Sequence, residues 1–406
     1  LTQDASTQVG SIKDVVISVP AYFKESQRNA TMQAGQLAGL NVIAIINEPT
    51  AAALYYASTT DIKGKGLVYD LGGGTFDVTV TQTDGKDIQI IASSGDHHLG
   101  GVDFDQAMLE LIEEKYKVQN NGKLYADEDG RHEFLLLAED IKKSLSSRKS
   151  VKQKLAGEDG KVTIEITQSE FEEKISTYIS RTELLVEQVL DEADCEESDI
   201  DYILLVGGSS RIPAIQKSIK KLMGKEPIVA VNVDEAVALG AAIKAGLVLV
   251  KDNPSMVSST IASEMKTIKV GDVANHSYGA ITLSYNENLG KYVDENVLII
   301  KKNTPLPSTM SDTFYTTHEG QELVSVTITI GEDSDPDFVD KVDVIVISLP
   351  SNRPEGQAIE VKYSYDENQI MHCEVKDVSS GKVESKRLDL SVDSSKKNSL
   401  DAFLVD

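Results

Sequence analysis

Short apolar runs alternate with longer helical patterns over the first 250 residues. β-Branched apolar runs predict buried strands at residues 15–19, 41–46, 66–70, 76–82, 87–93 and 202–206. Apolar residues at helical spacing predict helices at residues 25–40, 103–118, 132–148, 169–193, 211–223 and 233–249. A further helix is expected to begin at Asn47, with Pro49 in its first turn. Strands that alternate with helices favour an α/β domain over residues 1–251.

The pattern changes after residue 251. Residues 252–272 contain Pro254 and several Ser and Thr residues, and we interpret them as an interdomain linker. Alternating strands follow at residues 280–285, 297–300, 323–330, 342–348, 358–365 and 370–376, separated by turn residues. This spacing predicts an all-β sandwich domain over residues 273–393, and residues 394–406 are left as a C-terminal tail.

Composition narrows the classes of partner. The net charge of −25 argues against nucleic acid and anionic membrane surfaces, which are bound through Lys and Arg. The two cysteines are far apart in the sequence, so we expect a reducing, cytoplasmic compartment rather than a disulfide framework. No apolar run is long enough for a membrane span, and no signal peptide is visible. Because the chain begins with Leu1 rather than Met, we expect a fragment or a missing beginning.

The sharpest candidate for chemistry is the turn after the strand at 66–70. Asp70 ends that strand, and Gly72, Gly73, Gly74 and Thr75 follow it. Consecutive glycines let backbone N–H groups point into one concavity, which suits a phosphate. Asp70 is placed to hold Mg²⁺ through water, and the Thr75 hydroxyl to meet a phosphate oxygen. Taken alone, the same residues fit a tight hairpin without a ligand.

A second glycine turn, at residues 207–211, lies between a strand and a helix. Free N–H groups and the helix dipole favour an anion there, and Arg211 could stack on a purine. A sharp turn without a ligand is the alternative. Glu48, at a helix start, is either turned toward a metal-bound water or simply favoured by the helix dipole.

Four polar residues share one face of the helix predicted at 132–148. Their spacing of i, i+3, i+4 and i+7 aligns Glu139, Lys142, Lys143 and Ser146. They fit either a clamp on adenosine or a solvated charged face. Neighbouring His97 and His98 are not expected to bind a metal. The absence of a Walker lysine loop excludes a P-loop NTPase.

Several segments resemble the ATPase-domain signatures of the 70-kDa heat-shock chaperone family. They are VVISVPAYFKESQR at 15–28, NEPTAAA at 47–53, DLGGGTFD at 70–77, HLGGVDFD at 98–105, VGGSSRIP at 206–213 and DEAVALGAA at 234–242. The resemblance is strong over 12–250 and continues more weakly to about 390, through KNTPLP at 302–307, GQAIEV at 356–361 and YDENQI at 365–370. It implies an actin/hexokinase-like ATPase fold followed by a client-binding β domain.

The resemblance also implies ligands, partners and roles. The ligands would be ATP or ADP with Mg²⁺, and the partners unfolded polypeptides, a J-domain co-chaperone and a nucleotide-exchange factor. Catalysis would fall to Glu48, Asp70, Thr75 and Asp77. Nucleotide contacts would come from Gly72, Gly73, Gly74, Thr75, Gly100, Gly101, Glu139, Lys142, Lys143, Ser146, Gly207, Gly208, Ser209, Ser210, Arg211 and Asp234. Interdomain coupling would use Pro20 and Arg28, and a peptide groove would be lined by Leu283, Phe314, Val324 and Val326.

The chain departs from the family pattern in several places. The family's first phosphate loop and catalytic lysine would precede Leu1, so we expect the chain alone to hydrolyse ATP weakly. Its linker is less apolar than the family's, and His97 replaces a small polar residue. Because the sequence stops at Asp406, soon after the last predicted strand, we expect the chain to lack the family's helical lid. The leading hypothesis is an ATP-dependent chaperone. The alternatives are a weakly or non-hydrolysing heat-shock-like regulator, and an actin-like polymer or sugar kinase.

Overall fold

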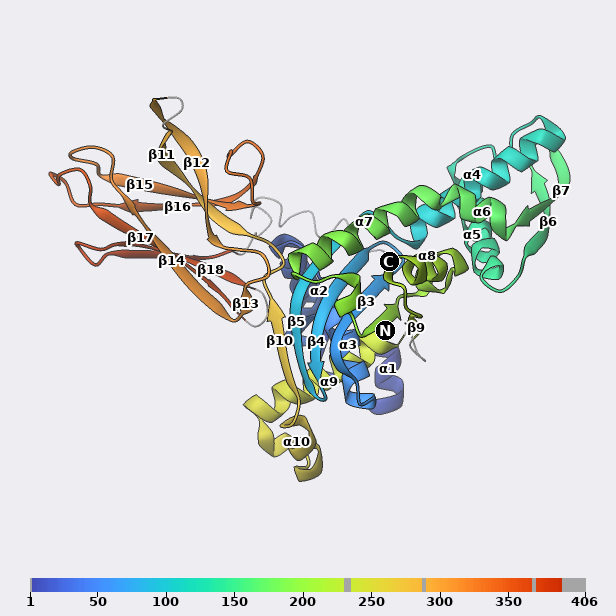
Figure 1. Cartoon of the computed structure of the whole chain (residues 1–406), viewed down its shortest axis with the longest axis horizontal. Coiled ribbons are helices and arrows are strands. Elements are labelled where there is room, and N and C mark those ends of the chain that lie inside the picture. Colours follow the sequence, from blue (N-terminus) through green and yellow to red (C-terminus); the bar gives the residue numbers. More distant parts are fainter. Residues whose placement is uncertain (1, 230–234, 287–289, 367–369, 389–406) are drawn as a thin grey trace.

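The computed structural model describes residues 2–229, 235–286, 290–366 and 370–388. A mixed α/β part comes first and a β-rich part follows, as the hydrophobic pattern predicts. The two parts lie side by side, and strand β10 (Lys269–Val273) runs between them (Figure 1). The predicted C-terminal tail, residues 394–406, lies outside the described residues.

A mixed sheet forms the centre of the α/β part. Its strand order is β13-β10-β5-β4-β3-β8-β9. Strand β8 is buried at every position because its Tyr-Ile-Leu-Leu-Val sequence is apolar on both faces, as expected of an inner strand. Strands β3 and β4 form an antiparallel hairpin, whereas β8 joins β3 in parallel. The other bounds are β3 (Lys63–Leu71), β4 (Phe76–Asp84), β5 (Asp87–Asp96), β8 (Tyr202–Val206), β9 (Ile228–Val229) and β13 (Pro305–Leu306).

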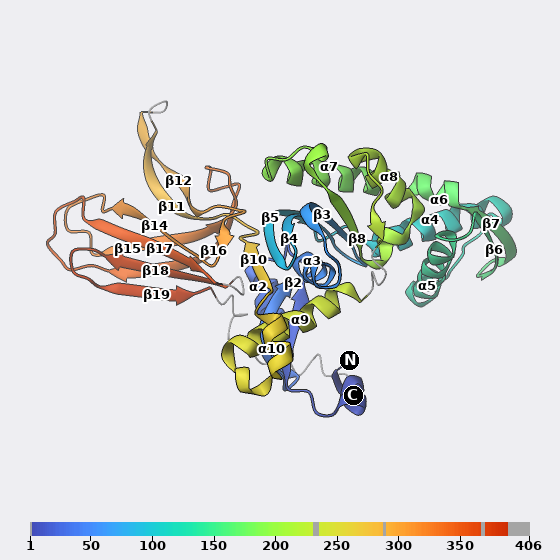
Figure 2. The same ribbon diagram turned by 60° about the horizontal axis from the view of Figure 1, so that its bottom comes forward.

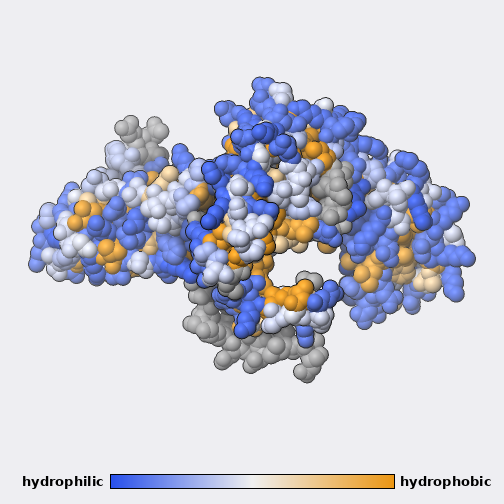
Figure 3. All heavy atoms as spheres, turned by 90° about the horizontal axis from the view of Figure 1, so that it is seen from below, coloured by the Kyte–Doolittle hydropathy of each residue, from blue (hydrophilic) through white to orange (hydrophobic). Residues whose placement is uncertain are grey.

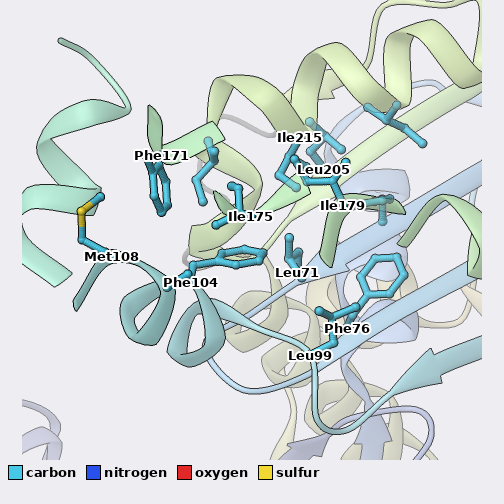
Figure 4. Packing of buried hydrophobic residues seen from close by; sticks show 14 of the residues in the cluster. Leu71, Phe76, Leu99, Phe104, Met108, Phe171, Ile175, Ile179, Leu205 and Ile215 are labelled. Carbon is cyan, nitrogen blue, oxygen red and sulfur yellow. The ribbon is translucent and has the colours of Figure 1, made fainter. Parts of the chain in front are cut away.

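Helices cover both faces of this sheet (Figure 2). Helices α3 (Glu48–Thr59) and α9 (Ala236–Asp252) pack on one face, where small alanines of α3 allow a close approach. The other face carries α7 (Ser176–Glu192) and α8 (Pro213–Met223), whereas α4 (Gly101–Asn120), α5 (Glu128–Leu145) and α6 (Gln168–Lys174) extend away from the sheet (Figure 1). The large core under these helices includes Phe104, Phe171 and Phe76, whose side chains are fully buried (Figure 4).

The local structure differs from the prediction in several segments. The helix expected at 169–193 is divided into α6 and α7 at Ile175, whose backbone leaves the helical region. The helix expected from 132 begins at Glu128, because the Asp127 side chain accepts a hydrogen bond from Gly130 N and caps it. A hairpin of β6 (Ser150–Gly157) and β7 (Gly160–Thr167) and helix α1 (Thr2–Val9) were not predicted.

The segment expected to be a linker has regular structure. It contains helix α10 (Ser259–Met265), capped by the Ser258 hydroxyl, and most of strand β10. Strand β10 pairs in parallel with β5 and antiparallel with β13. The chain between the two parts is therefore held against the sheet of the first part.

Two four-stranded sheets enclose the core of the β-rich part. One has the order β12-β11-β15-β16 and the other β14-β17-β18-β19. Alternating residues of the inner faces form one hydrophobic cluster, in which Tyr278, Val361 and Val375 are fully buried. The bounds are β11 (Tyr278–Asn286), β12 (Lys291–Ile300), β14 (Ser308–Tyr315), β15 (Leu323–Ile330), β16 (Asp340–Ser348), β17 (Ala358–Tyr365), β18 (Met371–Asp377) and β19 (Val383–Arg387).

A smaller parallel sheet, β1 (Asp14–Val19) with β2 (Asn41–Asn47), lies beside helix α2 (Glu25–Leu37). Viewed from below, hydrophobic residues border an opening near the centre of the protein, whereas both ends are mostly hydrophilic (Figure 3). Among the described residues, no helix is long and apolar enough to cross a membrane.

Candidate functional site

Three glycine-bearing turns meet beside the carboxyl ends of β3 and β8. They are the β3–β4 turn, the turn before α4 and the turn after β8. Gly101 N donates to Gly72 O at 3.0 Å, and Val102 N donates to Gly73 O at 2.8 Å. The Ser209 hydroxyl donates to Gly72 O at 2.9 Å. Backbone hydrogen bonds from two directions therefore fix the first glycine turn in place.

Close backbone contact explains the glycines at the junction of these turns. A Cβ atom on Gly100 would lie 2.7 Å from Gly74 Cα, and one on Gly101 would lie 2.8 Å from Ser209 Oγ. Gly207 has φ +79°, and a Cβ atom there would lie 2.4 Å from Leu71 O. By contrast, a Cβ on Gly73 or Gly74 would meet nothing within 4 Å. The tip of the first turn is thus open on one side.

A cavity of about 500 Å³ opens next to these turns. Its lining includes residues of the glycine turns, the charged face of α5 and the start of α8. Nine residues predicted from sequence line it together: Gly73, Gly101, Glu139, Lys142, Lys143, Ser146, Gly208, Ser209 and Arg211. The structure thus brings together the first glycine turn, the second glycine turn and the helical face, which are far apart in the sequence.

Three further residues, which sequence reasoning missed, also line the cavity: Val102, Asp105 and Ile212. Asp105 lies four residues after Gly101 on α4, so both are on the same helical face. That spacing was the available signal for Asp105. Val102 and Ile212 directly follow the predicted residues Gly101 and Arg211.

Two ion pairs stand at the wall of the cavity. Lys142 Nζ lies 2.7 Å from Asp105 Oδ1, and both side chains are nearly buried. Lys143 Nζ lies 2.7 Å from Glu139 Oε1 one helical turn away, at a more exposed position. The Lys143 contact lowers the pKa of Glu139, whereas burial raises the pKa of Asp105 despite its lysine partner.

Glu48, Asp70 and Asp77 form a second group of predicted residues, outside the cavity lining. Asp70 and Asp77 are opposite each other on the β3–β4 hairpin. Burial, then the charge of Asp77 and then that of Glu48, raises the pKa of Asp70 well above its ordinary value. Burial and Glu48 raise the pKa of Asp77 to about 7, although Tyr22 N donates to its Oδ1 at 3.2 Å. Burial also raises the pKa of Glu48.

These carboxylates fit a hard divalent cation, since their mutual repulsion is relieved by positive charge and their donors are all oxygen. Within the described residues, no group of three His, Cys, Asp or Glu side chains is arranged to ligate a metal directly. The donor set therefore fits Mg²⁺ that keeps part of its water shell.

The remaining predicted residues have structural contacts in the turns. The Thr75 carbonyl accepts from Gly72 N at 3.0 Å. Ser210 is fully buried, and its hydroxyl donates to Gly207 O at 2.7 Å, so it stabilises its own turn. Asp234 lies outside the described residues.

A second cavity, of about 850 Å³, lies in the β-sandwich. All four predicted groove residues, Leu283, Phe314, Val324 and Val326, line it, from strands β11, β14 and β15. Val326 is 5% exposed and Leu283 is 47% exposed, so the groove runs from the core to the surface. Asp312 and Glu355 are the charged residues in its described lining.

Pro20 and Arg28 lie where the two parts meet. The Arg28 guanidinium donates to Asn47 Oδ1 and to Ala21 O, and Asn47 Nδ2 donates to Asp272 Oδ2 of β10 at 3.0 Å. The turn that begins at Pro20 is closed by a hydrogen bond from Phe23 N. It presents Tyr22 N to Asp77.

The Tyr22 ring also joins both parts. Its centroid is 5.4 Å from that of His97, next to the turn before α4. On the other side, His276 of the β-rich part lies with its ring centroid 4.8 Å away. Asn275 Nδ2 donates to Ala21 O at 2.6 Å. These contacts connect the carboxylate group to the β-rich part in two steps.

The fold and its two cavities define a two-part protein, with a cavity lined by glycine and charged residues in a mixed α/β part and a groove lined by apolar and polar residues in a β-sandwich. The family model for "Hsp70 protein" matches residues 1–403. A curated relative, "Chaperone protein dnaK" from Guillardia theta, is 37% identical over 397 residues. The aligned region covers 95% of this chain and 59% of the length of that relative. The chain therefore belongs to the Hsp70 family.

Proposed function

We propose that this protein is an ATP-dependent molecular chaperone of the Hsp70 type, acting on unfolded or extended polypeptides. The observation that carries the proposal is the convergence of three glycine turns and a charged helical face on one cavity of about 500 Å³. Such a cavity is large enough for a nucleoside and offers N–H donors beside it for phosphates. Family membership supports the actin/hexokinase-like ATPase fold for the α/β part.

In this proposal the open tip of the first glycine turn receives the phosphates. Gly72, Gly73, Gly74, Gly100 and Gly101 shape the backbone there, and Thr75 offers its hydroxyl. The charged face of α5 and the turn at 207–211 hold the nucleoside, with Asp234 as a further contact. The open space at Gly73 and Gly74 supports this orientation, because a Cβ atom on either glycine would meet nothing within 4 Å.

Glu48, Asp70 and Asp77 would hold hydrated Mg²⁺ and the attacking water. When bound, Mg²⁺ would neutralise charge that develops on the phosphates. Asp70 lies one residue before the end of β3, next to the turn, so its carboxylate would orient a metal-bound water. Asp77, whose pKa burial and Glu48 raise to about 7, would help to orient the attacking water.

The groove in the β-sandwich would bind client segments in an extended form. Its lining combines strand edges with apolar side chains, the combination used to recognise extended peptides. We further propose that Pro20 and Arg28 couple the groove to the nucleotide, through Asn47 and Asp272. A J-domain co-chaperone and a nucleotide-exchange factor would be the partners, and a cytoplasmic compartment fits the two unpaired cysteines.

A regulator that binds ATP with little turnover is the second candidate. Its specific support is that Asn47 and Thr50 donate hydrogen bonds to Asp272 of β10, which would hold the chain between the two parts in one arrangement. The presence of all three carboxylates, Glu48, Asp70 and Asp77, favours a chaperone that hydrolyses ATP over this regulator. An actin-like polymer or sugar kinase is disfavoured by the family match and by the β-sandwich.

The test is ATP binding and single-turnover hydrolysis by the complete gene product, with and without an unfolded peptide. Hydrolysis that the peptide accelerates supports the chaperone proposal. Tight binding without turnover selects the regulator, and the absence of nucleotide binding refutes both.

A further inference from the structure

The Lys142 side chain reaches the cavity from α5 in a nearly buried position. Lys142 is 8% exposed, and so is Asp105 of α4, its ion-pair partner at 2.7 Å. Lys142 Nζ also donates to Gly101 O at 3.2 Å. The ammonium is therefore held from two sides, by a carboxylate and by the carbonyl of a glycine turn.

An ammonium group has three N–H donors. Gly101 O accepts one of those on Lys142, and the Asp105 carboxylate lies 2.7 Å from Nζ as an ion pair, so at least one donor remains for whatever occupies the cavity. The carboxylate also cancels the lysine charge locally. This wall of the cavity thus offers a donor in a fixed direction with little net charge, which suits an uncharged acceptor better than a phosphate.

Stability alone does not account for the pair. Burying two charges costs several kcal/mol of desolvation for each ion, and an apolar pair of similar size is often at least as stable. The same cavity has apolar lining at Val102 and Ile212, so apolar side chains are compatible with this wall. The second lysine, Lys143, is paired within its own helix and is mostly exposed, so it lacks such fixation.

We propose that Asp105 is a positioning residue of the nucleotide site. Its carboxylate orients the Lys142 ammonium so that a remaining N–H donor meets a hydroxyl group of the nucleoside sugar. Asp105 touches the lysine and acts through it. The inference rests on the proposed function, since it presupposes that the cavity binds a nucleotide.

The experiment compares Asp105→Asn with the unaltered protein, using the complete gene product. Affinities for ATP, 2′-deoxy-ATP and 3′-deoxy-ATP are measured by displacement of a fluorescent nucleotide. In the unaltered protein, we expect one of the two deoxy nucleotides to bind about tenfold more weakly than ATP. In Asp105→Asn, ATP affinity should fall by about tenfold and the difference between ATP and that deoxy nucleotide should largely vanish.

Two further variants separate positioning from a general structural role. Asp105→Glu keeps the charge and should recover part of the discrimination. Glu110→Gln changes an exposed carboxylate of the same helix and should leave all three affinities unchanged. Thermal unfolding without nucleotide is recorded for each variant. If Asp105→Asn does not fold, the double variant Asp105→Asn with Lys142→Gln, which leaves no unpaired buried charge, should likewise lose discrimination.

Unchanged ATP affinity in Asp105→Asn would overturn the inference, and so would an equal loss for all three nucleotides. Retained discrimination in the double variant would have the same consequence. Failure of the unaltered protein to bind any of these nucleotides would instead refute the proposed function, and the inference with it.

Discussion

Replacing Glu25 with glutamine removes an ionisable group from the contact between α2 and the β-sandwich. Glu25 is 1% exposed, and neither carboxylate oxygen has a side-chain hydrogen-bond partner. Burial raises its pKa from 4.5 to about 8, against the opposing effect of Arg28. Several groups of the β-sandwich face it, and they are Asp366, Arg387, the hydroxyls of Tyr278 and Tyr365, and the Met371 amide.

The raised pKa of Glu25 determines whether the contact between α2 and the β-sandwich becomes stronger or weaker as the pH rises. A carboxyl group whose pKa is raised by the contact binds its proton more tightly there than in water. The contribution of Glu25 to the stability of the contact between α2 and the β-sandwich is therefore fully present below pH 4.5. This contribution is lost as the pH rises through 8. One pKa unit corresponds to about 1.4 kcal/mol, so the contact should weaken by about 3 kcal/mol between pH 5.5 and 8.5. Glu25→Gln, which has no proton to lose, should be more stable than the unaltered protein at pH 7 by up to about 3 kcal/mol.

The assay follows separation of the two parts by hydrogen exchange of α2 and β18 amides at pH 5.5 and 8.5. The difference between variant and unaltered protein isolates Glu25 from other groups that titrate, such as His276, whose pKa burial lowers to about 4. Glu319→Gln, at an exposed position of the β-rich part, is the control and should change nothing. A variant that tracks the unaltered protein at both pH values would refute this reasoning.

Three other substitutions test the sites. Asp70→Asn should lower the rate of single-turnover ATP hydrolysis by at least 100-fold. Thermal stability should be kept or increased, because the raised pKa of Asp70 shows that burial disfavours its ionised carboxylate. Unchanged turnover would contradict the proposed role of Asp70 in catalysis. Gly100→Ala should destabilise the protein by about 1–3 kcal/mol and weaken nucleotide binding, whereas Gly74→Ala should be tolerated in denaturant titrations, since only the first Cβ meets backbone atoms. Phe314→Ser should weaken binding of a fluorescent extended peptide by about tenfold or more, and exposed Phe338→Ser should not; equal affinities would rule out the groove assignment.

Sequence reasoning found those parts of the site that depend on local spacing. The face of α5 was predictable because four polar residues recur at helical intervals, and the glycine turns because each follows an apolar strand. The spacing of Asp105 from Gly101 places both on one helical face, but it does not show the ion pair, because the partner Lys142 is 37 positions later in the chain. No local pattern reports that kind of pairing.

The fold was predictable to a similar extent. Inner strands such as β8 and the alternating strands of the sandwich were evident, because burial on one or both faces leaves a clear pattern. The β6–β7 hairpin was missed because its exposed face carries lysines and threonine around few buried residues. Strand β10 was taken for linker because Lys269 and Gly271 weaken its apolar run, and pairing with β5 supplies the order that the sequence lacks.

The docking of β10 has a consequence for β5. Strand β10 covers the free edge of β5 through only a short register, from Lys269 opposite Asp87 to Gly271 opposite Gln89. If β10 detached, β5 would present unpaired N–H and C=O groups to solvent, and any extended segment could pair with them. The edge of β5 is thus a pairing site for which β10 competes with other extended segments. The high local concentration of β10 protects the protein against self-association.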